Sequence, residues 1–235
     1  MLDKELTKKA ILKSPSTDEF SKSKCILTVS VGQPNHEEDK LLSAIIAVNK
    51  HFSFCTIMVC DSLQRFTMKF SSNVSLAELH IESNNLGDKW IERNLQAIRQ
   101  LSIPYSISRW DCWISHPHFN SKKTIIDDLY NNDKRFKETI DDTANNFVVR
   151  KLDMLGIDKK SAIELSKQYL LEECAVMLIQ ADDLNGFEIY PSQRNDAMDY
   201  VHKKIISVID GSLMLPVSIK FKNIRPAKVC VAEII

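Results

Sequence analysis

The chain alternates between short, continuously apolar segments and longer amphipathic ones. Cys25–Val31 consists of apolar and β-branched residues with one serine, and Phe54–Cys60 repeats this pattern ahead of Asp61. Such runs are typical of strands buried on both faces of a parallel sheet. Between them, a turn at 32–35 leads into residues 37–52, where apolar positions recur at helical spacing. Strand, turn, helix and strand in this order predict a βαβ unit.

The alternation continues to the end of the chain. We expect helices over about 86–101, 158–183 and 195–209, several helical stretches within about 122–155, and strands over 105–114, 187–191 and 216–221. Asp158 is expected to cap the helix over 158–183. Residues 1–22 are polar and rich in Lys and Ser, so we interpret them as a tail or a loose edge element. Because no repeat or Pro/Gly-rich linker interrupts 23–235, that region is predicted to be a single α/β domain.

Composition narrows the class of protein. The 235 residues are 44% apolar and carry 31 basic and 31 acidic side chains, so net charge gives no argument for a polyanionic partner. The six cysteines form no CxxC pair, which disfavours a disulfide framework or zinc ribbon and favours a reducing cytosol. The first residues lack a signal-peptide pattern, and the apolar runs are shorter than the ~20 residues that span a bilayer. We therefore expect a cytoplasmic protein without membrane segments.

The chain lacks the familiar nucleotide and metal motifs. Its five glycines cannot be arranged as a GxGxxG fingerprint or a P-loop, so no nucleotide cofactor is expected. His116 and His118 are close in sequence, but no HExxH or Cys/His cluster accompanies them, and no metal is expected.

Ser30 stands at the end of the first long predicted strand. Ligands of open α/β sheets bind at the carboxyl ends of the strands, so its hydroxyl is well placed for a pocket. A serine acts as a nucleophile only when it is activated or meets a reactive electrophile. A serine that satisfies backbone groups at a strand end is the structural alternative.

The segment QYLLEECAVMLI, residues 168–179, runs two carboxylates into an apolar block. On a helix, Tyr169 and Glu173 share one face. Residues 174–179 are apolar on all sides, which predicts that the carboxyl-terminal half of the helix is buried. A glutamate at this boundary either bonds the tyrosine or presents its charge to a cationic ligand. Spacing alone does not choose between Glu173 and Glu172. Tyr190, followed by Pro191, adds a second phenol at the end of another predicted strand.

Together, Ser30 in ILTVSVGQPN, Tyr169 and Glu173 in YLLEECAVML, and the later Tyr190-Pro191 resemble the cyclodipeptide synthase family. The similarity extends roughly from 24 to 209. Members of this family make diketopiperazines from two aminoacyl-tRNAs. Their fold resembles the catalytic domain of class I aminoacyl-tRNA synthetases, so the resemblance implies a Rossmann-like parallel sheet flanked by helices and no ATP-binding signature.

The resemblance also suggests a branch of the family. Pro191 follows Tyr190 directly, which resembles the Tyr-Pro branch of the family. Gln33 stands where the other branch has asparagine, so its identity agrees with the same branch. Thr28 stands where glycine is frequent and is expected to narrow the aminoacyl pocket. Ala175 stands where proline often follows the glutamate, and its effect is expected to be limited to helix geometry.

Roles for the site residues follow from the same resemblance. Ser30 would accept the aminoacyl group, Glu173 and Tyr169 would bind its α-ammonium, and Tyr190 would assist cyclisation. Gln33 is a candidate substrate-binding residue. Three further candidates are small or apolar and favour hydrophobic aminoacyl groups: Thr28, Val59 and Met177.

Two aminoacyl-tRNAs are the implied partners, and tRNA requires cations. Lys89 and Arg93 share a face of one predicted helix, and Arg99 lies partly around the same helix from that face. An ordinary solvated helix face is the alternative, because Asp88 and Glu92 dilute the charge. The sequence leaves open whether a downstream tailoring enzyme modifies the product.

Two other interpretations remain. An adenylating, synthetase-like enzyme would need a histidine-containing phosphate motif after the first strand, which GQPNH at 32–36 imitates poorly. A non-catalytic tRNA-binding module would keep the fold but not the chemistry.

Overall fold

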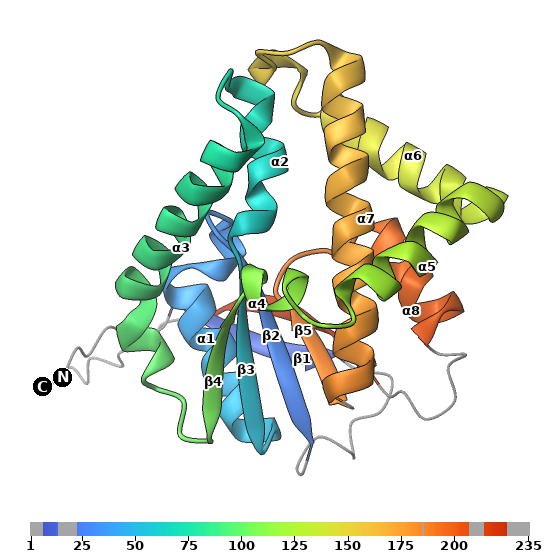
Figure 1. The fold of residues 1–235 in the computed structure, drawn as a ribbon. Helices are drawn as coiled ribbons and strands as arrows, with labels where there is room; N and C mark the ends of the chain where they lie inside the picture. Colours follow the sequence, from blue (N-terminus) through green and yellow to red (C-terminus); the bar gives the residue numbers. More distant parts are fainter. Residues whose placement is uncertain (1–6, 14–22, 185, 207–213, 225–235) are drawn as a thin grey trace, which may run out of the picture.

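The strands of the computed structural model form one sheet in the order β1-β6-β5-β2-β3-β4 (Figure 1). The structure describes residues 7–13, 23–184, 186–206 and 214–224. The strand bounds are β1 Lys8–Lys13, β2 Lys24–Ser30, β3 Phe54–Cys60, β4 Tyr105–Arg109, β5 Gly186–Tyr190 and β6 Met214–Asn223.

Strand β2 lies inside the sheet, between β5 and β3, and pairs in parallel with both. After β2 the chain turns at Gly32, whose φ of 79° favours glycine, and enters helix α1, Glu38–His51. It then returns as β3, so the predicted βαβ unit is confirmed. Among the described strands, only β1 runs antiparallel, beside β6 at the sheet edge.

Alternate residues of β2 face two different helical layers. Cys25, Leu27 and Val29 belong to the core cluster that contains α1 and α3 residues. Ile26 belongs to the opposite cluster, together with residues of α4 and α7. Because side chains alternate along a strand, Thr28 and Ser30 share the face of Ile26.

The helices cover both faces of this sheet (Figure 1). After α1 they are α2 Arg65–Met68, α3 Leu76–Ile98, α4 Trp110–Ile114, α5 Phe119–Asn132, α6 Lys134–Val149, α7 Lys159–Leu184 and α8 Asp196–Lys204. Short 3₁₀ turns η2 to η5 cover Pro34–His36, Ser62–Gln64, Lys69–Ser71 and Leu152–Met154. Residues of α5, α6 and α8 pack with α7 in a separate apolar cluster.

Several predicted boundaries were wrong. Helix α3 begins at Leu76 and not near 86, because Ser75 and Glu78 form a capping box there. The segment predicted as a strand over 105–114 changes to helix α4 at Trp110. By contrast, the helical stretches predicted over about 122–155 are present as two helices, α5 and α6, and Asp133 caps the second.

Helix α7 confirms the prediction for 158–183. Asp158 accepts a hydrogen bond of 2.9 Å from the Ser161 N–H, as a capping residue does. The carboxyl-terminal half of α7 is buried between the sheet and the cluster formed with α5, α6 and α8. Helix α8 ends at Lys204, before the predicted end near 209, and residues 207–209 lie outside the described part.

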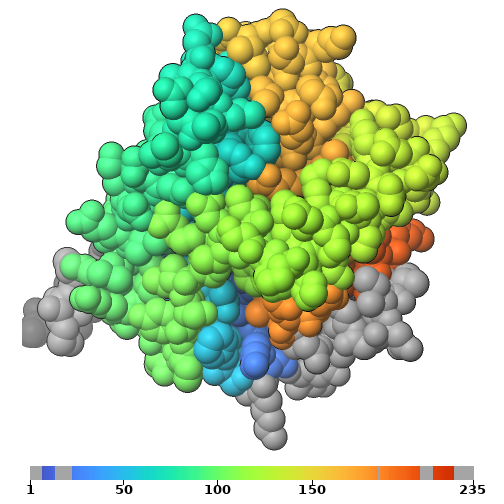
Figure 2. Space-filling model, viewed as in Figure 1, coloured from blue at the N-terminus to red at the C-terminus, as the bar shows by residue number. Residues whose placement is uncertain are grey.

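The first 22 residues are not all a tail. Residues 8–13 form the edge strand β1, which agrees with the edge-element alternative, while 14–22 lie outside the described residues. Figure 2 shows the segment from β4 to α5, in green, covering the front of the molecule. Among the described helices, none combines the length and the hydropathy needed to cross a bilayer.

Candidate active site

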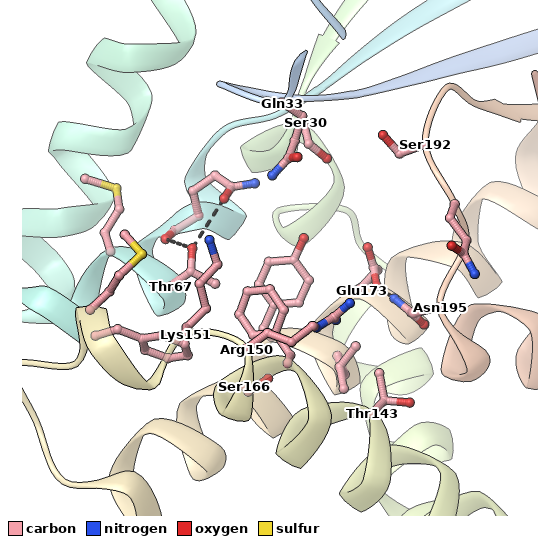
Figure 3. Close-up of a pocket in the computed structure, with 18 of the residues that line it drawn as sticks. Ser30, Gln33, Thr67, Thr143, Arg150, Lys151, Ser166, Glu173, Ser192 and Asn195 are labelled. Carbon is pink, nitrogen blue, oxygen red and sulfur yellow. Dashed lines mark hydrogen bonds between the residues drawn. The ribbon is translucent and has the colours of Figure 1, made fainter. Parts of the chain in front are cut away.

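A pocket of about 540 Å³ opens at the carboxyl edge of the sheet (Figure 3). Ser30 at the end of β2 and Tyr190 at the end of β5 contribute from the sheet. Tyr169 and Glu173 contribute from α7, one helical turn apart. Gln33 lines the pocket from the turn after β2. The fold therefore brings together four predicted catalytic residues that are up to 160 positions apart in sequence.

Ser30 is buried and held by three hydrogen-bond contacts. Its N–H donates to His36 Nδ1 at 2.7 Å, and its Oγ lies 3.3 Å from the Tyr190 hydroxyl. The Ser30 carbonyl accepts from the Gln33 N–H at 3.2 Å, which closes the turn. The hydroxyl thus stands at the strand end and faces a phenol.

His36 was missed from the sequence, although it follows Ser30 closely. Its ring is fully buried, and burial lowers its pKa to about 3, so it is neutral. Nδ1 accepts from Ser30, so the proton is on Nε2, which donates to Ser192 Oγ at 2.8 Å. The ring also meets Tyr190 edge-on, with centroids 5.2 Å apart. His36 therefore holds the backbone of Ser30 and the ring of Tyr190 in position.

The adjacent glutamates have different partners. Glu172 forms an ion pair with Arg65 and accepts from Trp110 Nε1 at 2.8 Å. This carboxylate faces α2 and α4 and is fully engaged there. Glu172 is buried, and Glu173 is half-buried at the pocket.

Glu173 faces the pocket and has a neutral partner. Asn195 Nδ2 donates to its Oε2 at 3.2 Å, and among the described residues it forms no ion pair. Burial raises the pKa of Glu173 to about 7, helped by nearby Glu188, while Asn195 and Arg194 act in the opposite direction. The carboxyl group therefore exchanges a proton near neutral pH and can accept a cationic partner.

Asn195 is held in one orientation. Its Oδ1 accepts from the Met198 N–H at 2.8 Å and caps α8, which leaves Nδ2 directed at Glu173. Beneath it, Glu188 is bonded to Arg194 and to His202. Burial would raise the pKa of Glu188, but these two partners hold it at about 2.

Both tyrosines keep their protons at neutral pH. Burial raises the pKa of Tyr169 and of Tyr190, and the negative charge of Glu173 raises both further. Their hydroxyl groups are thus hydrogen-bond donors to whatever occupies the pocket.

The predicted substrate-binding residues divide into two groups. Thr28 and Met177 line a second, smaller cavity that shares Glu173 with the main pocket. Val59 lines neither cavity, because its side chain lies in the cluster between the sheet and α1 and α3. The alternation of side chains along β3 places Val59 on the opposite face from Met58, which does line the smaller cavity.

The three predicted tRNA-binding cations are all exposed but lie away from the pocket wall. Lys89 and Arg93 are on α3, Arg99 follows its last residue, and Arg93 pairs with Glu37 at 2.8 Å. Two cations missed from the sequence, Arg150 and Lys151, line the pocket itself, at the end of α6 (Figure 3). Neither pairs with a carboxylate within the described part of the chain. The described residues also contain no cluster of His, Cys, Asp or Glu that could hold a metal ion.

The chain is similar to several solved structures over most of its length. A CDPS (cyclodipeptide synthase) from Fluoribacter dumoffii is 33% identical, with a TM-score of 0.86, and the match covers 92% of this chain and 100% of that one. A cyclodipeptide synthase from Candidatus Glomeribacter gigasporarum, bound to Phe-tRNAPhe, is 20% identical, with a TM-score of 0.71 and coverage of 90% and 93%.

A third match, from Mycobacterium tuberculosis, is 9% identical, with a TM-score of 0.65 and coverage of 95% and 100%. Its description relates cyclodipeptide synthetases to type I tRNA synthetases. The predicted α/β fold, a largely parallel sheet flanked by helices, is thereby confirmed. No family model and no curated protein matches the chain.

Proposed function

The chain belongs to the cyclodipeptide synthase family, and from this premise we propose that it forms a diketopiperazine from two aminoacyl-tRNAs through an acyl-enzyme on Ser30. The residues brought together at the pocket support this mechanism. The proposed substrates imply that the reaction takes place in the cytoplasm.

The single observation that carries the proposal is that two adjacent carboxylates have different kinds of partner. Glu172 has the guanidinium of Arg65, whereas Glu173 faces a pocket and, among the described residues, is hydrogen-bonded only to the Asn195 amide. A largely buried carboxylate without a cation gains free energy when an ammonium group arrives. The α-ammonium of an aminoacyl group is such a cation, and Tyr169 stands one turn away on the same side of α7.

In the first step, Ser30 Oγ attacks the ester carbonyl of one aminoacyl-tRNA. The new Oγ–carbonyl bond replaces the bond to the ribose oxygen, and the Ser30 proton passes to that leaving oxygen. Tyr190, 3.3 Å from Oγ, is close enough to relay this proton. The ester is already activated, so the step requires no ATP.

In the second step, the amino group of the Ser30-bound residue attacks the ester of the second aminoacyl-tRNA. The amine must lose a proton before it can attack, and Glu173, with a pKa of about 7, is matched to accept it. The peptide bond forms, the second tRNA leaves, and a dipeptidyl-enzyme remains.

In the last step, the free amine of the dipeptide attacks the Ser30 ester and closes the ring. Ser30 Oγ is the leaving group and regains a proton, which the Tyr190 hydroxyl is positioned to donate. The main pocket of about 540 Å³ is large enough for a dipeptide in this step.

We also place the chain in the Tyr-Pro branch of the family, on the basis of Tyr190-Pro191 and Gln33.

The test is expression in bacteria, with cyclic dipeptides measured in the medium by mass spectrometry. Cells that express the wild-type protein should release a diketopiperazine, and cells that express Ser30→Ala should release none. Intact-protein mass spectrometry after mixing with aminoacyl-tRNA should detect the acyl adduct in the wild type alone. Aminoacyl-tRNA binding that survives in Ser30→Ala, with no adduct or product from folded wild type, would favour a non-catalytic tRNA-binding module.

A further inference from the structure

Acyl transfer to Ser30 places negative charge on the carbonyl oxygen of the aminoacyl ester. In the proposed function, Tyr190 serves the attacking and leaving oxygens, while Tyr169 and Glu173 hold the α-ammonium. None of these groups is assigned to the carbonyl oxygen. A hydrogen-bond donor directed at such an oxyanion contributes about 10²- to 10³-fold to the rate, so a further donor is expected in the wall of the main pocket.

Two backbone donors near Ser30 are already engaged. The Ser30 N–H donates to His36 Nδ1 at 2.7 Å, and the Gln33 N–H donates to the Ser30 carbonyl at 3.2 Å. Neither N–H can turn to a substrate oxygen without losing its bond. The side-chain amide of Gln33 lines the pocket, but no hydrogen bond to the described residues fixes its direction (Figure 3).

Gln64 lines the same pocket and has a side-chain amide with a defined direction. Its Nε2 donates to the Cys60 carbonyl at 3.4 Å. The Thr67 hydroxyl is shared between the Gln64 backbone carbonyl, at 3.0 Å, and Oε1, at 3.3 Å, as the dashed lines at Thr67 in Figure 3 mark. The reverse orientation of the amide would set Oε1 against the Cys60 carbonyl oxygen. Because an amide nitrogen carries two hydrogens, one remains free after the bond to Cys60.

The sheet places this amide beside Ser30. Cys60 ends β3 and is the register partner of Ser30 at the end of β2. Neighbouring strands lie about 4.8 Å apart. The free hydrogen of Gln64 is therefore carried by a group that is anchored to the residue next to Ser30 and that faces the same pocket.

The turn that carries Gln64 is held on both sides. The Gln64 N–H donates to the Asp61 carbonyl at 2.9 Å. The next residue, Arg65, donates to the Ser62 carbonyl at 2.8 Å and forms the ion pair with Glu172 on α7. A donor that is fixed before the substrate arrives stabilises an oxyanion well, because little reorganisation accompanies the reaction.

We propose that Gln64 Nε2 is the oxyanion donor for acyl transfer at Ser30, an inference that rests on the proposed function. As Ser30 Oγ attacks, the π electrons of the ester carbonyl move to its oxygen, and the free N–H of Gln64 donates to that oxygen. The carbonyl then re-forms while the bond to the ribose oxygen breaks. Ring closure passes through a second tetrahedral intermediate at the Ser30 ester, so the same donor serves the last step.

The experiment measures the single-turnover rate constant of Ser30 acylation over a range of aminoacyl-tRNA concentrations, by rapid quench and intact-protein mass spectrometry. Gln64→Met keeps the length of the side chain but removes the N–H. It should lower the maximal rate constant by about 10²-fold or more and change the half-saturating concentration by less than about threefold, since the lost bond exists only in the transition state. Gln64→Glu replaces the donor by an acceptor and should lose more.

Gln168→Met is the matched control, because Gln168 is exposed on α7 and borders a different surface groove. It should acylate at the wild-type rate. The rate constant does not depend on the fraction of folded enzyme, so partial misfolding does not obscure the result. If Gln64→Met does not fold at all, Gln64→Ala takes its place with the same expected loss.

A maximal rate constant within about threefold of the wild type in the Gln64 variant would overturn the inference. A change confined to the half-saturating concentration would also overturn it and would assign Gln64 to ground-state binding. In both cases the wild type still forms the adduct, and the proposed function stands. Absence of an adduct in folded wild type would overturn the proposed function itself, and the inference with it.

Discussion

Glu172 and Glu173 are neighbours in sequence, yet their carboxylates point to different sides of α7. Glu172 is paired with Arg65 and bonded to Trp110, and it fixes α7 against α2 and α4. Glu173 faces the pocket, with Asn195 as its partner. One carboxylate contributes to the fold, and the other keeps its binding capacity for a ligand. Two matched substitutions at these positions should therefore have opposite effects on stability.

Glu172→Gln should destabilise the protein by about 3 kcal/mol at pH 8, because it leaves the largely buried Arg65 without its counter-charge. Glu173→Gln should stabilise the protein at the same pH, because it removes an uncompensated buried charge. The free energy of unfolding from urea titration gives both values. Destabilisation of equal size in the two variants would show that the carboxylates have the same role.

The stabilisation by Glu173→Gln should depend on pH. Burial raises the pKa of Glu173 to about 7 in the folded state, above its ordinary value of 4.5. The wild type therefore loses stability as pH rises from about 4.5 to 7, by up to about 3 kcal/mol, whereas the glutamine variant does not. The difference between the two should be small at pH 4 and constant above pH 8. A difference that does not vary with pH would contradict the assignment.

Asn195 should act on the reaction through Glu173. Asn195→Asp keeps the oxygen that caps α8 but replaces the donor to Glu173 by a carboxylate, and Asn195→Ala removes both groups. Each change should raise the pKa of Glu173 and shift the acidic limb of the kcat/KM profile to higher pH. Only Asn195→Ala should also lose about 1 kcal/mol of stability through the missing cap. A lower rate with an unshifted profile would indicate a purely structural role.

Tyr190→Phe should slow acylation of Ser30 while preserving the pocket. The substituted ring keeps its edge-on contact with His36, but the hydroxyl 3.3 Å from Ser30 Oγ is lost. A positioned proton donor or acceptor contributes about 10²- to 10⁴-fold to a rate, and a loss in this range is expected. Rapid-quench measurement of the acyl adduct gives the rate. Acylation within a few-fold of the wild type would remove Tyr190 from the first step.

The cations of the pocket wall should matter more for tRNA than Arg93. Arg150 and Lys151 line the pocket, whereas Arg93 is already paired with Glu37. We expect the double variant Arg150→Ala, Lys151→Ala to raise KM for aminoacyl-tRNA and to reduce the slope of log KM against log salt by about 0.7 per lost phosphate contact.

Arg93→Ala should leave that slope nearly unchanged and serves as the matched control on α3. Lys89→Ala with Arg99→Ala tests the rest of the patch that the sequence predicted. A slope that falls only in the α3 variants would assign tRNA binding to α3 and not to the pocket wall.

The sequence by itself determined the elements with the most regular patterns and their order along the chain. Continuous apolar runs predicted β2 and β3, and helical periodicity predicted α1 and α7, because the pattern of buried positions follows the geometry of each element. Strand ends and the border of a buried helix are recognisable in one dimension, which made Ser30, Tyr190 and the segment around Tyr169 candidates, and the family resemblance then selected these residues together with Glu173.

The tertiary structure decided which face each side chain occupies and which partner it meets. Val59 and Met58 are adjacent in sequence, but the pleat sends one to the α1 side and the other to the smaller cavity. Helical spacing did not distinguish Glu173 from Glu172, and the physical difference between them is that Arg65, more than 100 residues earlier, reaches Glu172. The contacts of His36 with Ser192 and Tyr190, and of Asn195 with Glu173, could not be predicted for the same reason: they join distant parts of the chain, which only the packed chain brings together.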